Sequence, residues 1–274
     1  MYIISAVVEK NQSRVAIHDA EHTLLLKKEG PFTSLSELCL DAISEQNIKP
    51  TDVKYIGIAV DDSVGTPALI ASDIEKDTGI RCLYASVMGA RALGEAHLSG
   101  GVPSLFLLKV DNTVECGIVI ENKVFTGTHH LGGKIAHMVI HTGGYACTCG
   151  RKGCFEAYAS NAGLKRIAAE SGLADIESLT HAELFNMYSP EAELAKKKYV
   201  TYLAGGITNI INLFQPNEVV LEGPFTTAGE ALTAPMMDIL LREQYTHSLS
   251  NKCKIRLSDQ TEDTALIGAP LLEQ

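Results

Sequence analysis

The sequence predicts an α/β protein built from two related lobes. Short apolar runs alternate with segments of helical periodicity along the chain, which is typical of α/β proteins. Strand-like runs are grouped ahead of helix-like runs twice, which indicates two similar lobes. The 274 residues, 46% of them hydrophobic, are enough for two lobes of roughly 110 to 160 residues each.

The first lobe is expected to open with three strands joined by turns. A helix is predicted to begin at Ser34, because Glu37 stands three residues later and completes a capping box. Its buried stripe is predicted to consist of Leu35, Leu38, Leu40 and Ile43. Strands are expected over residues 2–8, 14–18, 23–27, 55–60 and 81–84, and further helices over residues 69–78 and 88–98.

The pattern restarts after Gly100 and Gly101, where the second lobe is expected to begin. Glu121 and Asn122 are predicted to form the tight turn of a hairpin. Strands are expected over residues 104–110, 115–120, 123–125, 218–221 and 254–257. Helices are expected over residues 164–171, 181–187, 190–214, 228–242 and 264–272.

Composition and charge exclude several classes of protein. The formal net charge of −10 argues against a nucleic-acid partner. No apolar run approaches the ~20 residues of a membrane span, and the opening residues lack the features of a secretion signal. Four isolated cysteines in apolar surroundings fit a reducing compartment, which predicts a cytoplasmic protein; they are Cys39, Cys82, Cys116 and Cys253.

One short segment carries the pattern H-x9-C-x-C-x4-C, formed by His137, Cys147, Cys149 and Cys154. Zinc takes four such ligands in a tetrahedron, and a closed Cys3His set leaves no position for substrate or water. The pattern therefore predicts a structural zinc. A disulfide between Cys147 and Cys149 would be badly strained by its one-residue spacing. His141 remains an alternative ligand to His137.

The segment 133–160 resembles the signature of the ROK family, which contains bacterial sugar kinases and sugar-responsive repressors: G-E-x-G-H, then C-x-C-G-x-x-G-C-x-E and a nearby Ser. Residues 212–223 (NLFQPNEVVLEG) and 263–274 (DTALIGAPLLEQ) are similar to the family as well. The resemblance implies an actin-like ATPase (ribonuclease H-like) fold, with a mixed β-sheet and helices in each lobe. It implies an N-terminal lobe over 1–105, joined by the final helix at about 262–274, and a C-terminal lobe over 106–261 with the zinc loop at 133–160.

Two phosphate-binding turns of the family are altered in this chain. The resemblance places residues 7–11 (VVEKN) where the family has D-x-G-G-T, and residues 111–117 where it has a second glycine-rich turn. Gly117 and Gly223 are the cofactor-binding residues that the resemblance still implies. Glu9 and Glu115 would place carboxylates beside the triphosphate. The repulsion between one carboxylate and one phosphate charge ~4 Å apart is about 4 kcal/mol at an effective dielectric near 20. ATP and Mg²⁺ are therefore not expected to bind in the family manner.

The resemblance also leaves the chemical step without its base. Ser86 and Val87 stand where the family has an Asn-Asp pair whose Asp takes the proton from the sugar hydroxyl. Valine cannot accept a proton, so no catalytic residue is assigned. Asp61, Asp62 and Asp111 are the nearby carboxylates that could replace the base, although Asp-rich turns are common without any function.

The resemblance implies three substrate-binding residues, each with a structural alternative. Glu156 matches the family's sugar-binding Glu, or it braces a loop. His137 ligates the metal and could also shape a sugar pocket. Lys134 replaces the family's sugar-contacting Glu, and is either a solvated lysine or a contact for an anionic sugar. His129 and His130 are expected on an exposed loop, with a second metal site as the alternative.

Three functions follow from these observations. The favoured hypothesis is a catalytically impaired sugar-kinase homologue, or pseudokinase, that binds a small sugar or regulates a partner. The alternative is an active ATP-dependent sugar kinase of the glucokinase, fructokinase or N-acetylmannosamine kinase type. A DNA-binding repressor is the least favoured, because such relatives carry an additional N-terminal segment while this chain enters its first strand at Tyr2. The resemblance implies a homodimer.

Overall fold

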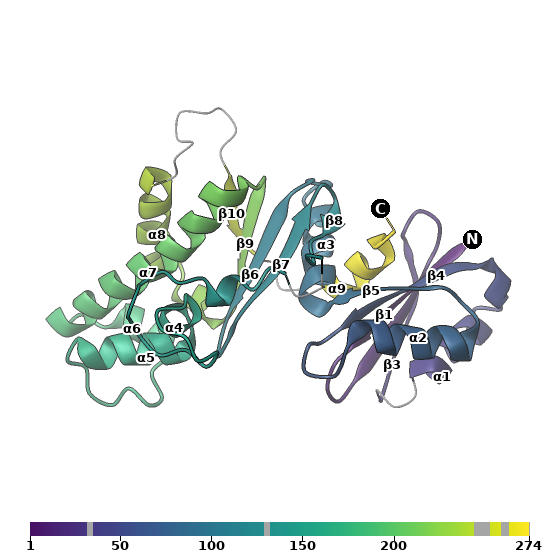
Figure 1. Ribbon diagram of the computed structural model, residues 1–274, viewed down its shortest axis with the longest axis horizontal. Coiled ribbons are helices and arrows are strands. Elements are labelled where there is room, and N and C mark those ends of the chain that lie inside the picture. Colours follow the sequence, from purple (N-terminus) through teal and green to yellow (C-terminus); the bar gives the residue numbers. More distant parts are fainter. Residues whose placement is uncertain (32–34, 129–131, 244–252, 259–262, 274) are drawn as a thin grey trace. The chain divides into compact units, whose positions relative to one another are not determined.

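The computed structural model describes residues 1–31, 35–128, 132–243, 253–258 and 263–273. Its first sheet has five strands in the order β3-β2-β1-β4-β5 (Figure 1). They are β1 (Tyr2–Val8), β2 (Ser13–His18), β3 (Leu24–Gly30), β4 (Val53–Val60) and β5 (Cys82–Ser86). The sheet is mixed, because β1 pairs antiparallel with β2 and parallel with β4.

The second sheet repeats this order. Its strands are β6 (Leu105–Val110), β7 (Val114–Ile120), β8 (Lys123–Val124), β9 (Glu218–Glu222) and β10 (Lys254–Leu257). The order β10-β9-β6-β7-β8, read from β8, again gives third, second, first, fourth and fifth strand. The chain divides into two compact units. Unit 1 comprises Met1–Phe106, Gly117–Gly127 and Asp259–Gln274, and unit 2 comprises Leu107–Cys116 and Thr128–Ser258.

Strand alternation in unit 1 creates two apolar faces. Ile4, Ala6 and Val8 point to one face, where they pack with residues of α1 and α2. Val7 lies on the opposite face with residues of α3 and α9. This division follows from the two-residue period of a strand. The helices of unit 1 are α1 (Leu35–Glu45), α2 (Pro67–Thr78), α3 (Val87–Leu98) and α9 (Thr264–Gly268), with short 3-10 helices η2 (Pro50–Asp52) and η5 (Ala269–Leu271).

The helices of unit 2 gather around one long helix, α7, which packs against α4, α5, α6 and α8 (Figure 1). They are α4 (Glu156–Ala159), α5 (Asn161–Glu170), α6 (His181–Asn186), α7 (Pro190–Phe214) and α8 (Glu230–Glu243), with 3-10 helices η3 (Ile135–His137) and η4 (Pro224–Ala228). The Ser189 side chain accepts a hydrogen bond from the Ala192 amide and Pro190 opens the first turn, so α7 begins as its sequence predicts.

The predicted elements are largely confirmed, with one error in packing. Leu40 is exposed, whereas Cys39 and Ala42 are buried with Leu35 and Ile43. Residues 35, 39, 42 and 43 lie on one face of a 3.6-residue helix, and residue 40 lies beside that face. The predicted helix start at Ser34 falls outside the described residues. None of the described helices has the length and apolar character that crossing a membrane requires.

A buried histidine gives unit 2 a pH-dependent stability. His181 is 2% exposed, and its Nε2 lies 2.8 Å from the Tyr199 hydroxyl, which donates to the Ala159 carbonyl oxygen. Burial lowers the pKa of His181 to about 4. The unfolded state therefore binds one more proton than the folded state between pH 6.5 and about 4, and protonation favours unfolding there.

We predict that the free energy of unfolding falls by about 3 kcal/mol through His181 as the pH drops through this window. Denaturant titrations at several pH values measure the fall. Burial also lowers the pKa of His18, so the wild-type loss contains a second contribution of the same sign. His181→Gln should remove only the part of this fall that is due to His181. If the free energy of unfolding of the variant depended on pH as steeply as that of the wild type, His181 would not be its source.

Candidate functional site

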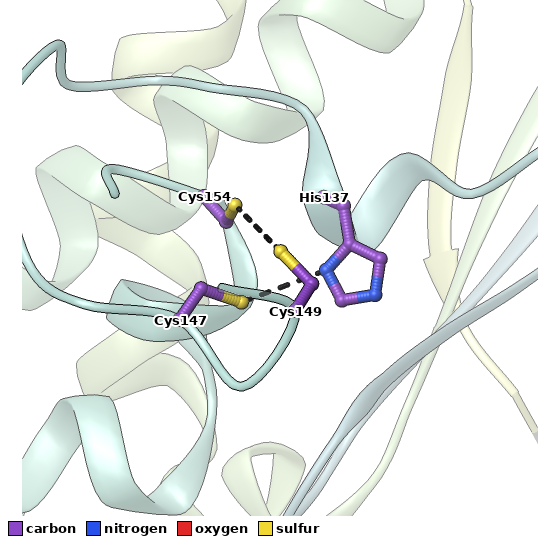
Figure 2. Close-up of side chains that lie close together, drawn as sticks. All are labelled: His137, Cys147, Cys149 and Cys154. Atoms are coloured by element: carbon purple, nitrogen blue, oxygen red, sulfur yellow. Dashed lines mark hydrogen bonds between the residues drawn. The ribbon is translucent and has the colours of Figure 1, made fainter. Parts of the chain in front are cut away.

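The sequence-predicted metal ligands converge on one point in unit 2 (Figure 2). His137 ends η3, Cys147 and Cys149 lie on the following loop, and Cys154 stands just before α4. The four ligand atoms all lie within 4.8 Å of one another. Cys147 Sγ is 3.6 Å from His137 Nδ1, and Cys149 Sγ is 3.6 Å from Cys154 Sγ.

The spacing and chemistry of these atoms fit a tetrahedral metal ion. Ligands bound about 2.3 Å from a central ion in a tetrahedron lie ~3.8 Å apart, close to the separations observed. A hydrogen bond from the Arg151 backbone lowers the pKa of the exposed Cys149, which favours the thiolate that binds metal. Burial raises the pKa of Cys154 to about 12, so this thiol needs a metal to become a thiolate near neutral pH. The cluster can therefore hold a metal.

The backbone around the cluster folds back on itself twice. Val139 forms a β-bridge with Cys154, and Ala146 forms another with Lys152. Gly153 makes the first return tight, because a Cβ there would lie 1.8 Å from the His141 carbonyl oxygen. These two bridges bring ligands from separate parts of the loop together.

His141, the alternative ligand, lies outside the cluster. Its ring stacks with those of Tyr158 and Tyr202, with centroid separations of 5.8 and 6.1 Å. Its Nδ1 is 3.5 Å from the Tyr202 hydroxyl oxygen. The geometry therefore selects His137 from the two candidates.

Glu156, a predicted sugar ligand, is 8% exposed and is bonded within the protein. One carboxylate oxygen, Oε2, accepts from the Val114 amide at 3.1 Å. The other, Oε1, accepts from the Thr148 hydroxyl at 3.1 Å and lies 3.7 Å from Cys147 Sγ. These contacts match the brace that the sequence left as an alternative.

The remaining polar candidates occupy separate places. Lys134 is exposed at the start of η3. The Asp61 carboxylate accepts from the Ser63 amide at 2.8 Å, as expected for a residue that stabilises its own turn. His129 and His130 lie outside the described residues.

Val87, which the family resemblance aligns with the base, is a partly buried residue of unit 1. It packs against a buried cluster composed of Val7, Ala16, Ala59, Ala90, Ala265 and Leu266. Its neighbour Ser86 caps α3 and accepts a hydrogen bond from the Gly89 amide at 3.1 Å. Neither side chain is arranged as a proton acceptor for a substrate.

The turn after β1 is held by ion pairs that the sequence analysis missed. Arg14 Nη2 lies 3.3 Å from Glu9 Oε2, and Arg14 Nη1 lies 3.7 Å from Asp263 Oδ1. Lys27 Nζ also donates to Asp263 Oδ1 at 2.6 Å, and this bond raises the pKa of Lys27. Glu9 is therefore partly neutralised, so its repulsion of a phosphate is weaker than the sequence suggests. An arginine directly before the apolar run Val15–Ile17 of β2 was the available signal.

The turn between β6 and β7 is pinned by a side chain of α5. Asn161 Nδ2 donates to Asp111 Oδ1 at 2.8 Å and to Asn112 Oδ1 at 3.1 Å. The backbone N–H of Asn161 donates to the backbone carbonyl oxygen of Asp111 at 2.9 Å. Glu115 is exposed, and its Oε1 accepts from the Thr113 hydroxyl at 3.2 Å. Asp111 is thus engaged as a turn residue.

Both predicted cofactor-binding glycines allow close backbone packing. A Cβ on Gly117 would lie 1.9 Å from the Met88 carbonyl oxygen, and a Cβ on Gly223 would lie 2.0 Å from the Val110 carbonyl oxygen. Gly223 also has a φ of +126°, which side chains rarely adopt. Packing alone therefore requires glycine at both positions.

Comparison with known proteins places these features in a family context. The ROK family sequence model matches residues 51–274. A glucokinase from Halalkalibacterium halodurans is 27% identical over 213 residues, covering 71% of this chain and 64% of the glucokinase. The xylose repressor of Bacillus subtilis is 27% identical over 158 residues, covering 56% of this chain and 40% of the repressor. The chain thus matches less than two thirds of the length of either relative.

The structural match extends along nearly the whole chain. The crystal structure of a ROK hexokinase from Thermus thermophilus is similar with a TM-score of 0.83 at 24% identity. The match covers 99% of this chain and 97% of the hexokinase. This likeness confirms the actin-like ATPase fold expected from the sequence.

The packing explanation for the glycines predicts an effect in the absence of any nucleotide. Gly117→Ala should lower the free energy of unfolding by ~1–3 kcal/mol, because the new methyl group collides with the backbone of α3. The matched control is Gly205→Ala in α7, where a Cβ meets nothing within 4 Å. That variant should be neutral or more stable by up to about 1 kcal/mol. Equal stabilities for the two variants in denaturant titrations would refute the packing explanation.

Proposed function

This chain belongs to the ROK family, and from that premise we propose that it is a catalytically impaired member. It keeps a zinc-braced scaffold and acts as a sugar-binding or regulatory protein. Zinc is the proposed metal because three thiolates and one imidazole form a closed tetrahedral set, which suits a structural site.

The apolar side chain of Val87 and its packing against an aliphatic cluster are the observation that carries the proposal. A general base typically contributes ~10²–10⁴-fold to the rate, and it must lie within hydrogen-bonding distance of the proton that it accepts. Val87 offers no acceptor, and its packing partners in unit 1 are aliphatic. Phosphoryl transfer also depends on positioned phosphates. Residues 7–11 lack the glycines that the family resemblance leads one to expect, and residues 111–117 retain only Gly117.

The proposed ligand is a small sugar or sugar derivative. The relatives are named glucokinase and xylose repressor, so sugars connect the enzymes with the regulators among them. Glu156 and His137 are the proposed contacts, with Lys134 as a contact for an acidic group. We further propose a cytoplasmic homodimer that binds neither nucleic acid nor membrane.

An active ATP-dependent sugar kinase is the second candidate. It is favoured by the Glu9–Arg14 ion pair, which reduces the charge repulsion expected at the first phosphate turn. The sugar would be one of those phosphorylated by glucokinase, fructokinase or N-acetylmannosamine kinase. This candidate requires a base from elsewhere in the chain, and Asp61 and Asp111 are the residues to test.

We predict about one zinc per purified chain, measured by elemental mass spectrometry. Cys149→Ala should lose the metal and lower the thermal midpoint by several degrees, because the loop over residues 143–160 loses its central constraint. Cys253→Ser is the matched control, since Cys253 lies in the same unit but outside the cluster. If wild-type protein without metal were as stable as wild-type protein supplied with zinc, a structural zinc would be excluded.

The proposal is tested by measuring sugar binding and turnover separately. With ATP and Mg²⁺, the chain should form no sugar phosphate above background from glucose, fructose, mannose or their N-acetylated forms. Val87→Asp alone should not restore turnover, because the phosphate turns remain altered and groups that act together do not recover singly. One of the sugars should still raise the thermal midpoint.

Robust wild-type turnover would overturn the proposal. Its loss in Asp61→Asn or Asp111→Asn would identify the replacement base and establish the kinase. A complete absence of both turnover and sugar stabilisation would reject the sugar-binding role and leave the regulatory role.

A further inference from the structure

A single buried carboxylate connects the metal cluster with the β6–β7 turn, defined here as residues 111–113. Glu156 follows the metal ligand Cys154 by two residues and begins α4. Its Oε2 accepts from the amide of Val114, the first residue of β7. This bond joins positions that are 42 residues apart in the chain.

The other oxygen of Glu156 is held from inside the metal loop. Thr148 stands between the ligands Cys147 and Cys149, and its hydroxyl donates to Glu156 Oε1 at 3.1 Å. Cys147 Sγ lies 3.7 Å from the same oxygen. A metal-bound thiolate can only accept hydrogen bonds, so Thr148 becomes the remaining donor to Oε1 when the cluster is loaded.

The β6–β7 turn has a second anchor that does not involve the cluster. Asn161 of α5 holds Asp111 and Asn112 through three hydrogen bonds. Glu156 instead holds Val114, the residue that directly follows the turn. Loss of the Glu156 contact should therefore loosen the Val114 side while the Asp111 side stays in place.

From these contacts we infer that Glu156 is a positioning residue that transmits metal occupancy of the cluster to the β6–β7 turn. With metal bound, Cys147 and Cys149 fix Thr148, Thr148 fixes the carboxylate, and the carboxylate holds the Val114 amide. Without metal the loop loses its constraint, so neither Thr148 nor the Cys147 thiol is held at the carboxylate, and the loss of donors to a buried carboxylate is unfavourable. The turn is then released from α4. This coupling between the metal site and the turn goes beyond the proposed function and does not depend on sugar binding.

Hydrogen exchange tests the link directly on the full chain, with and without chelator. In wild type, removal of the metal should speed exchange of the Val114 amide about tenfold, the effect of losing one hydrogen bond to a charged group. Amides in the middle of α7 serve as an internal reference. Metal content is measured in parallel.

Thr148→Ala removes the contact between the loop and the carboxylate while all four metal ligands remain. It should retain the metal, yet its Val114 exchange should no longer respond to chelation. Thr142→Ala is the matched control, because Thr142 is exposed on the same loop and is not a partner of Glu156 in the described structure. It should respond as wild type does.

Glu156→Gln provides a second test where Thr148→Ala fails to hold metal. The amide has one acceptor oxygen, so it can serve Val114 or Thr148 but not both. Unchanged Val114 exchange after complete metal removal from wild type would overturn the inference. So would an equal rise in α7, because the metal would then support the whole unit, and so would a wild-type response in both Thr148→Ala and Glu156→Gln.

Discussion

His137, Cys147, Cys149 and Cys154 must meet at one point, and this convergence sets the path of the chain between η3 and α4. Two β-bridges and the close approach of the backbone at Gly153 leave this segment few other backbone conformations. The residue after the last ligand, Phe155, is buried against α7, where a Cβ on Gly206 would lie 2.2 Å from its ring. Glu156 comes next and reaches β7. The two residues that follow the last ligand therefore connect the cluster directly to α7 and to the sheet of unit 2.

The residues that maintain the scaffold and those that would perform chemistry differ in how they fit the family pattern. Gly117 and Gly223 are the glycines that the resemblance aligns with it, and both are required by backbone packing alone. Val87 departs from it, and it packs against an apolar cluster. The turn after β1 also departs, and ion pairs among Glu9, Arg14 and Asp263 hold it instead. A chain that keeps its fold without performing phosphoryl transfer would show this division.

Local sequence signals predicted most of the fold, whereas the long-range contacts at the candidate site could not be predicted from the sequence. Helix α7 has its predicted bounds because Ser189, Pro190 and a continuous apolar stripe all mark them. Leu40 was assigned to the buried stripe of α1 by hydrophobicity, but the helical period places Cys39 and Ala42 there. The four metal ligands lie close together in sequence, so their spacing identified them. The Glu156–Val114 and Arg14–Asp263 contacts join distant segments, and no local pattern indicates such partners.

We propose that the scaffold persists while its two phosphate-binding turns no longer bind ATP. Calorimetric titration of the metal-loaded chain with ATP and Mg²⁺, at saturating glucose, tests this claim without depending on turnover. We expect a Kd for ATP above the millimolar range, because residues 7–11 and 111–117 offer few of the glycine amides that contact phosphates, and Glu115 adds a negative charge. A micromolar Kd would contradict it and favour an active sugar kinase.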